Sequence, residues 1–92
     1  MTNEVPLEIL LAGFNPEEHD LLLMDCYDEC IIGVVERAGQ SPIVCYDRDK
    51  VLQQHMDDGM DYEEALEFFE FNQLGAWVGD ATPCFLTPNG LK

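Results

Sequence analysis

The stretch DECIIGVVERAGQSPIVCYDRDK, residues 28–50, decides the fold, because its apolar residues fit either a helix or a pair of strands. Its isoleucines and valines are β-branched, and such residues favour a strand. The residues around them favour a helix instead: acids precede the run, Arg37 lies near its end, and Gly39 and Pro42 follow. The β-branched residues and the residues that flank them therefore predict different secondary structures for the same segment.

We follow the flanking residues, which predict a helix over residues 29–38, followed by a short strand over 43–46. The alternative is a hairpin in which 31–35 pairs with 42–46, as the β-branched residues would prefer. A second short strand is expected at 83–87, where it can pair with 43–46.

Two segments flanking this stretch carry clear helix starts. Asp47 is expected to cap a helix over 48–57, which Gly59 ends. Upstream, Asn15 followed by proline and two glutamates predicts a helix from about residue 16 to residue 24, with asparagine as the N-cap and proline at the first helical position. Residues 1–14 are expected to be a flexible or loosely packed N-terminal segment.

The last helix is expected to begin after Asp61, because Glu64 lies three residues later in a capping-box spacing. On a helical wheel its apolar residues share one face and its glutamates the opposite side, with Phe71 among the acids. The side chains expected to be buried are Tyr62, Ala65, Leu66 and Phe69, with Phe68 flanking this face. The following GAWVGDATP loop is expected to use its glycines in turns of positive φ and to pack Trp77 as a lid.

The predicted fold is α+β, with three or four short helices and a minimal two-stranded sheet in one small domain spanning 1–92. A core of this size is consistent with the composition, since 47% of the residues are hydrophobic.

The charge distribution is the most unusual property of the chain. Nineteen acidic residues accompany four basic ones, for a formal charge of −15, and residues 57–80 hold eight acids and no base. Nucleic acids and anionic membranes bind through lysine and arginine, so we expect neither as a direct partner. No apolar run approaches the roughly 20 residues that span a bilayer, and a cytoplasmic location is expected.

The cysteines do not form a metal-binding pattern. Cys26 and Cys30 are the one close pair, whereas a structural zinc site normally shows two. We therefore expect free thiols, no metal, no cofactor and no catalytic residue. A small metal- or thiol-dependent enzyme remains the alternative, with Cys45, Cys84 and His55 as further candidates.

Three segments of the chain share a pattern with known proteins: YDRDKV (46–51), DGM-x-x-EEA (58–65) and EFNQLGAWVGDATPCF (70–85). Through these segments the chain resembles a group of small proteins encoded by bacteriophages and prophages. The upstream DECIIGVVERAGQ (28–40) is similar as well, so the resemblance covers about 24–87. It implies a viral or prophage context but no established activity. Among the residues expected to fix the fold are Phe69 and, matching the shared pattern, Asn72, Gly75, Trp77, Gly79 and Pro83.

These observations predict a non-enzymatic protein-binding module whose acidic surface meets a basic site on a host protein. In its strongest form it would mimic a nucleic acid, because Glu63 to Glu70 span about 10 Å of helix, comparable with the spacing of phosphates. The alternative is that the acids only confer solubility or salt tolerance. The candidate partner-binding residues are Asp57, Asp58, Asp61, Glu63, Glu64, Glu67 and Glu70.

Overall fold

The computed structural model describes residues 5–90 and shows a small α+β domain with four short α-helices and a three-stranded sheet. The α-helices are α1 (Leu7–Leu10), α2 (Pro16–His19), α3 (Arg48–Asp57) and α4 (Tyr62–Phe69), and the strands are β1 (Ile31–Val35), β2 (Ile43–Asp47) and β3 (Cys84–Leu86). A 3-10 turn, η1 (Asp28–Cys30), precedes β1, and a π-helical turn, η2 (Glu70–Leu74), follows α4. The α+β class is thus confirmed.

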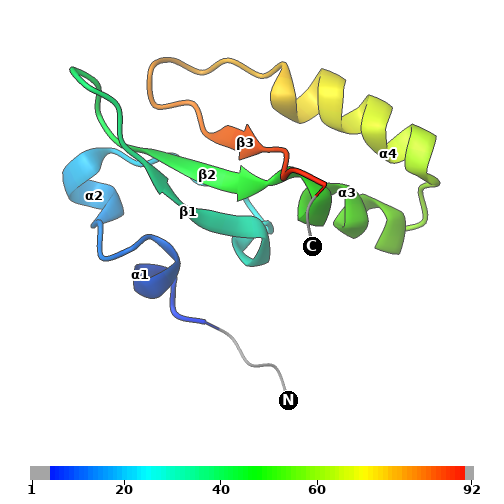
Figure 1. Ribbon diagram of the computed structural model, residues 1–92, viewed down its shortest axis with the longest axis horizontal. Coiled ribbons are helices and arrows are strands. Elements are labelled where there is room, and N and C mark those ends of the chain that lie inside the picture. The colour runs from blue at the N-terminus through cyan, green and yellow to red at the C-terminus, as the bar shows by residue number, and fades with distance from the viewer. Residues whose placement is uncertain (1–4, 91–92) are drawn as a thin grey trace.

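The sheet has the order β1-β2-β3, with β1 antiparallel and β3 parallel to the central β2. The helices α3 and α4 form the crossover from β2 to β3, and they lie toward one end of the sheet, whereas α1 and α2 lie toward the other (Figure 1). The expected pairing of residues 43–46 with a strand near 84 is confirmed. The sheet was expected to have two strands, however, and β1 is a third strand that was not predicted.

The predicted helix over 29–38 is wrong, and the hairpin forms in its place. Ile31 pairs with Tyr46 and Val35 with Ile43, with a bulge at Ile32 that leaves this side chain half exposed. The acids before the run start only the η1 turn, and Gly39 lies in the hairpin loop at a φ of 72°. Pairing with a buried central strand therefore outweighs the helix preference of the residues that flank the segment.

The predicted helix over 16–24 is too long, although its start is correct. Asn15 Oδ1 accepts the backbone N–H of Glu17 at 2.8 Å, as expected of an N-cap. The helix ends after one turn, at Asp20, whose φ of 52° is left-handed. The irregular segment that follows lets Leu21 enter the core and lets the Met24 N–H donate to the Tyr46 hydroxyl at 2.6 Å. In a continuous helix, the four consecutive apolar residues 21–24 would point in all directions around the helix axis and could not all face the core.

The other two helix starts are confirmed. Asp47 Oδ1 accepts the N–H of Asp49 at 2.9 Å at the start of α3, which has the predicted bounds. At α4, the Asp61 carboxylate accepts the Glu64 N–H at 2.8 Å, and the Glu64 carboxylate accepts the Asp61 N–H at 3.1 Å. This reciprocal capping box fixes where α4 begins.

The core lies between one face of the sheet and the helices. Its largest fully buried side chains are Leu11, Val44, Tyr46, Val51 and Phe69. Leu11 directly follows α1, so the N-terminal segment contributes to the core; residues 1–4 of the segment expected to be loosely packed lie outside the described residues. Phe85 of β3 packs edge-on against Phe69, with ring centroids 4.9 Å apart, and links the last strand to α4.

Candidate functional site

The acidic residues proposed to bind a partner are all exposed, as expected. They occupy the end of α3, the cap of α4, α4 itself and the first residue of η2. We call this set the acidic face: Asp57, Asp58, Asp61, Glu63, Glu64, Glu67 and Glu70. Three of them also have structural partners, because Asp61 and Glu64 form the capping box and Asp57 accepts a hydrogen bond from Gln53 at 2.9 Å.

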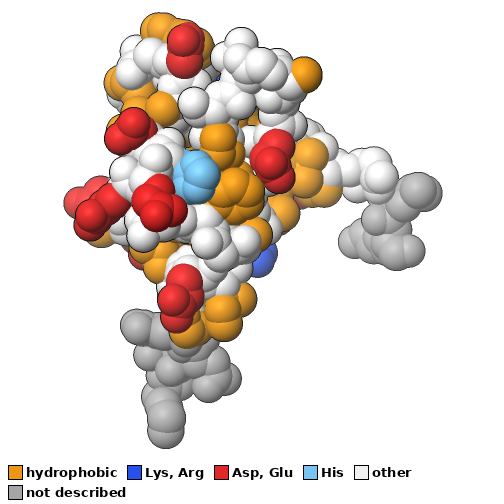
Figure 2. Space-filling model, turned by 90° about the vertical axis from the view of Figure 1, so that its left-hand side faces the viewer, with side chains coloured by type: hydrophobic (Ala, Val, Ile, Leu, Met, Phe, Trp, Pro, Cys, Tyr) orange, Lys and Arg blue, Asp and Glu red, His pale blue; other side chains and the backbone are white. Residues whose placement is uncertain are grey.

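No residue of the acidic face forms an ion pair within residues 5–90. The one ion pair in this part of the chain joins Arg48 to Asp49 at 3.7 Å, on α3. Elsewhere on the surface the pattern is similar: at the end of the molecule near α2, acidic side chains stand around hydrophobic ones with hardly any basic side chain in view (Figure 2). The negative charge of the acidic face is therefore not neutralised by the described chain.

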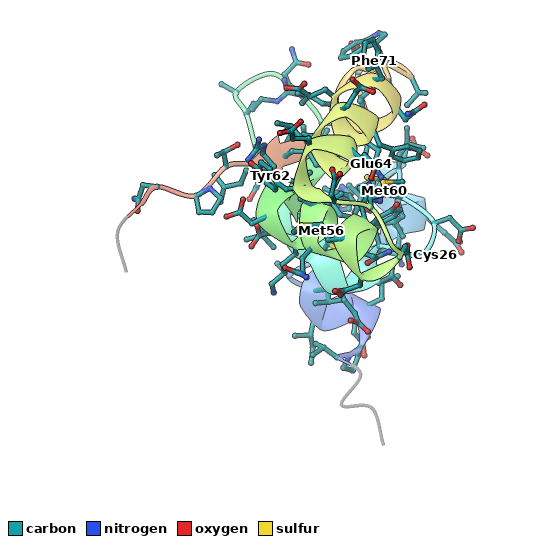
Figure 3. The ribbon with its side chains drawn as sticks, turned by 90° about the vertical axis from the view of Figure 1, so that its right-hand side faces the viewer. Cys26, Met56, Met60, Tyr62, Glu64 and Phe71 are labelled. Atoms are coloured by element: carbon teal, nitrogen blue, oxygen red, sulfur yellow. The ribbon has the colours of Figure 1, made fainter. Side chains whose placement is uncertain are left out.

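A hollow of about 280 Å³ lies on the acidic face, along one side of α4 and the start of η2. It brings Glu64 and Glu67 together with two aromatic rings, whereas the other five acidic-face residues do not line it. Figure 3 shows Phe71 projecting at the far end of the last helix from Met60 and Glu64. We call this feature the acidic hollow: Met60, Glu64, Glu67, Phe68, Phe71 and Asn72.

The chemistry of the acidic hollow suits a cation. Carboxylates form charge-assisted hydrogen bonds with guanidinium and ammonium groups, and aromatic faces attract the same groups through cation–π contact. Phe71 is 78% exposed, so its ring is open to a partner. A lysine or arginine side chain would meet both kinds of contact in one place.

Buried contacts hold Phe68 in place behind the acidic hollow. His55 of α3 is 3% exposed, its ring lies edge-on to Phe68 with centroids 4.8 Å apart, and its Nε2 is 2.8 Å from Gln73 Oε1. The Asn72 side-chain amide donates to the Phe68 carbonyl at 3.2 Å. The hollow is therefore attached to the packed interior of the domain and is not a free loop.

The expected burial of Trp77 and Tyr62 is wrong, and Leu66 is only half buried, whereas the burial of Phe69 and Ala65 is confirmed. Trp77 is 72% exposed, because the loop after η2 does not fold back over α4. It runs to β3 through a turn in which the Val78 N–H donates to Thr82 Oγ1 at 2.9 Å. Tyr62 is half exposed because it is the first residue of α4, at the helix end farthest from Phe69.

The loop requires glycine at positions 75 and 79 for different structural reasons. Gly79 has a φ of 108°, which a side chain rarely tolerates. Gly75 has an ordinary φ of −82°, so the expected left-handed turn is wrong there. A Cβ on Gly75 would lie 3.0 Å from the Glu70 carbonyl oxygen, which accepts the Gly75 N–H and closes η2. Glycine therefore permits the close approach of backbone that the π-helical turn requires.

The cysteines occur as free thiols, and their positions differ. Cys26 is exposed, Cys30 and Cys45 are buried, and Cys84 is half buried. Cys45 and Cys84 are direct partners in the parallel ladder of β2 and β3. Within residues 5–90, no three histidine, cysteine or acidic side chains gather as metal ligands would.

Raising the pH from about 9 to about 11 is expected to lower the free energy of unfolding. Burial, together with a hydrogen bond to Cys84, raises the pKa of Cys45 from 9.0 to about 11, and burial also raises the pKa of Tyr46. Over this interval the unfolded chain releases protons that the folded chain keeps, so stability falls with rising pH. Urea titrations across this pH range would measure the loss, which should shrink in the Cys45→Ala variant. A stability that rises over the interval would contradict it.

Comparison with known proteins gives no match to a family model, to a curated protein or to a solved structure. Within residues 5–90, no helix has the length and apolar character needed to span a membrane.

The sequence singles out the acidic residues of the acidic hollow but not its aromatic residues. Phe68 had been placed beside the buried face, yet it is 39% exposed and lines the hollow. The available signal was Phe71, which falls among the glutamates on the helical wheel. An aromatic residue in an acidic row is not explained by core packing, and in the structure it lines the hollow.

Proposed function

We propose that this protein is a non-enzymatic binding module whose acidic face holds a basic surface of a partner protein. The observation that carries the proposal is the acidic hollow, where Glu64 and Glu67 lie beside Phe68 and Phe71 without a basic residue in contact. An arginine or lysine of the partner would complete this arrangement. The hollow supplies the specific contact, and the remaining acids supply the surrounding field.

The phage or prophage resemblance makes a host protein, in the host cytoplasm, the partner of this proposal. In the strong form, the acidic face mimics the phosphates of a nucleic acid and occupies the binding site of a host nucleic-acid-binding or defence protein. The support for this form is the row of exposed carboxylates along α4 and into η2. Such a surface would be attracted to a groove lined with lysine and arginine.

The proposal is tested by the double variant Glu64→Gln/Glu67→Gln, with an oligo-arginine peptide as the probe. Glutamine at 64 retains an oxygen for the capping box, so α4 should stay folded. Loss of two charges facing the peptide, at about 0.2–1 kcal/mol each, predicts binding that is about twofold to thirtyfold weaker. Wild-type binding should also weaken between low and physiological salt. Isothermal titration of the two proteins at both salt concentrations measures both effects.

The matched control is Glu8→Gln/Glu36→Gln, which removes the same charge from exposed positions outside the acidic face. Its affinity for the peptide should stay close to that of the wild type. If both double variants bind alike, the hollow has no special role. If neither the substitutions nor salt change binding, the acids serve only solubility, and the proposal fails.

A further inference from the structure

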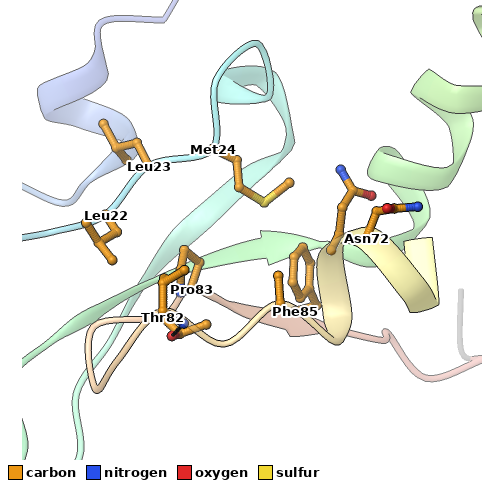
Figure 4. A pocket seen from close by; sticks show the side chains of 10 residues that line it. Leu22, Leu23, Met24, Asn72, Thr82, Pro83 and Phe85 are labelled. Atoms are coloured by element: carbon orange, nitrogen blue, oxygen red, sulfur yellow. Dashed lines mark hydrogen bonds between the residues drawn. The ribbon is translucent and has the colours of Figure 1, made fainter. Parts of the chain in front are cut away.

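A second depression, larger and apolar, lies on the other side of η2. It has a volume of about 480 Å³ and is open to solvent between the segment after α2 and the loop that leads to β3 (Figure 4). We call it the apolar groove: Leu22, Leu23, Met24, Asn72, Gln73, Ala76, Val78, Thr82, Pro83 and Phe85. Side chains from two distant parts of the sequence thus form its two walls.

The polar side chains of the apolar groove are already engaged within the protein. Thr82 Oγ1 donates to the Gly79 carbonyl and accepts from Val78 N–H, Gln73 bonds to His55, and the Asn72 amide bonds to the Phe68 carbonyl. The groove therefore offers a ligand mainly apolar contact. A bulky aliphatic or aromatic side chain fits this chemistry better than a polar ligand does.

Exposed hydrophobic residues lie in and beside the groove, at the end of η2 and in the loop that follows it. Leu74 is 56% exposed, Val78 64% and Trp77 72%. Aromatic residues, tryptophan above all, are enriched among those that contribute most to protein interfaces. An apolar groove bordered by such residues on a small domain marks an interaction site.

The apolar groove and the acidic hollow are adjacent. Asn72 lines both, and η2 separates them. A single segment of a partner could therefore place an apolar side chain in the groove and a basic side chain in the hollow.

The charge around the groove decides between possible occupants. The walls adjoin Asp25 on one side and Asp80 on the other, both exposed, and no basic residue occurs in residues 14–30 or 57–80. A second copy of this chain also carries a charge of −15 and would be repelled. A basic partner is attracted by the same field.

We propose that the apolar groove is the anchor site for the basic partner, and that it takes an apolar side chain next to lysine or arginine in the partner's sequence. This inference rests on the proposed function, since the acidic hollow holds the basic residue. It adds that charge alone does not define the partner. The recognised element is an amphipathic, basic segment, and binding buries both kinds of side chain together.

A random peptide library tests this inference without knowledge of the natural partner. Peptides are selected on the wild-type protein, and the most enriched one is synthesised and titrated while the fluorescence of Trp77, the only tryptophan, is recorded. We expect enriched peptides to carry an apolar residue beside lysine or arginine. Their binding should shift the Trp77 emission to the blue, because this exposed ring loses contact with water.

The groove variant is Leu22→Ser/Val78→Ser, which changes one exposed residue on each wall. It should bind the enriched peptide about tenfold more weakly, the effect of losing one well-buried apolar contact. The control is Ile9→Ser/Ile32→Ser, which removes apolar residues of similar exposure outside the groove and should bind as the wild type does.

The outcomes separate this inference from the proposed function. Enriched peptides that are basic but show no apolar preference, together with unchanged binding by the groove variant, would overturn the groove and leave the proposed function standing. Enrichment without lysine or arginine would overturn both. Equal losses in the groove variant and in its control would show a general effect of lost apolar surface and would also overturn the groove.

Discussion

Replacing Phe69 with alanine is expected to lower the free energy of unfolding by about 3–5 kcal/mol, as for other fully buried aromatic residues. The Phe69 ring is fully buried, packs against Phe85, and has the Arg48 guanidinium 5.9 Å above its centroid. It joins α4 to β3, so its loss leaves a cavity at the junction of two elements. For a domain of ordinary stability this change approaches complete unfolding. Urea denaturation followed by circular dichroism measures it.

Trp77→Ala is the matched control for this prediction. The tryptophan is the larger side chain, but it is mostly exposed, so its removal should change stability by only about 0.5 kcal/mol. Comparable losses in the two variants would mean that the loop covers the core, as the sequence alone had predicted, and would contradict the structure.

The second large effect is expected for Tyr46→Phe, at about 1–3 kcal/mol of destabilisation. The variant keeps the buried ring but removes the hydroxyl that accepts the Met24 N–H at 2.6 Å. That amide would then lack a partner at a partly buried position. Because Met24 lines the apolar groove, the peptide affinity should fall together with the stability.

Tyr62→Phe provides the comparison, because it deletes the same hydroxyl from a half-exposed residue. Its free energy of unfolding should remain within about 0.5 kcal/mol of the wild type. Thermal denaturation of both variants, each beside a peptide titration, distinguishes the hydrogen bond from a general effect of losing a hydroxyl. Equal stabilities of the two variants would show that the Tyr46 hydroxyl contributes nothing.

The sequence predicts best where a local interaction determines the structure. The caps at Asn15, Asp47 and Asp61 all form as expected, because each joins a side chain to backbone only two or three residues away. The bounds of α3 follow from its cap. The exposure of the glutamates on α4 follows likewise from the helical period, once the start of the helix is fixed.

The failures occur where distant contacts decide. Residues 31–35 become a strand because they pair with the buried strand β2. The segment after Asp20 does not continue the helix because Tyr46 and the core bind it there. No local pattern contains these partners. The apolar groove is unpredictable for the same reason, since its walls are brought together only by the sheet and η2.

The parallel pairing of β2 with β3 also imposes an order on folding. Both strands of the β1–β2 hairpin precede α3 in the chain, whereas β3 follows α4. During synthesis, the hairpin can therefore form while the other edge of β2 is still without its neighbour, and such an edge can pair with strands of other molecules. The crossover helices bring β3 to that edge, and Phe85 then reaches Tyr46 and Phe69. The last strand thus covers the second edge of β2 and leaves β1 and β3 as the edge strands of the sheet.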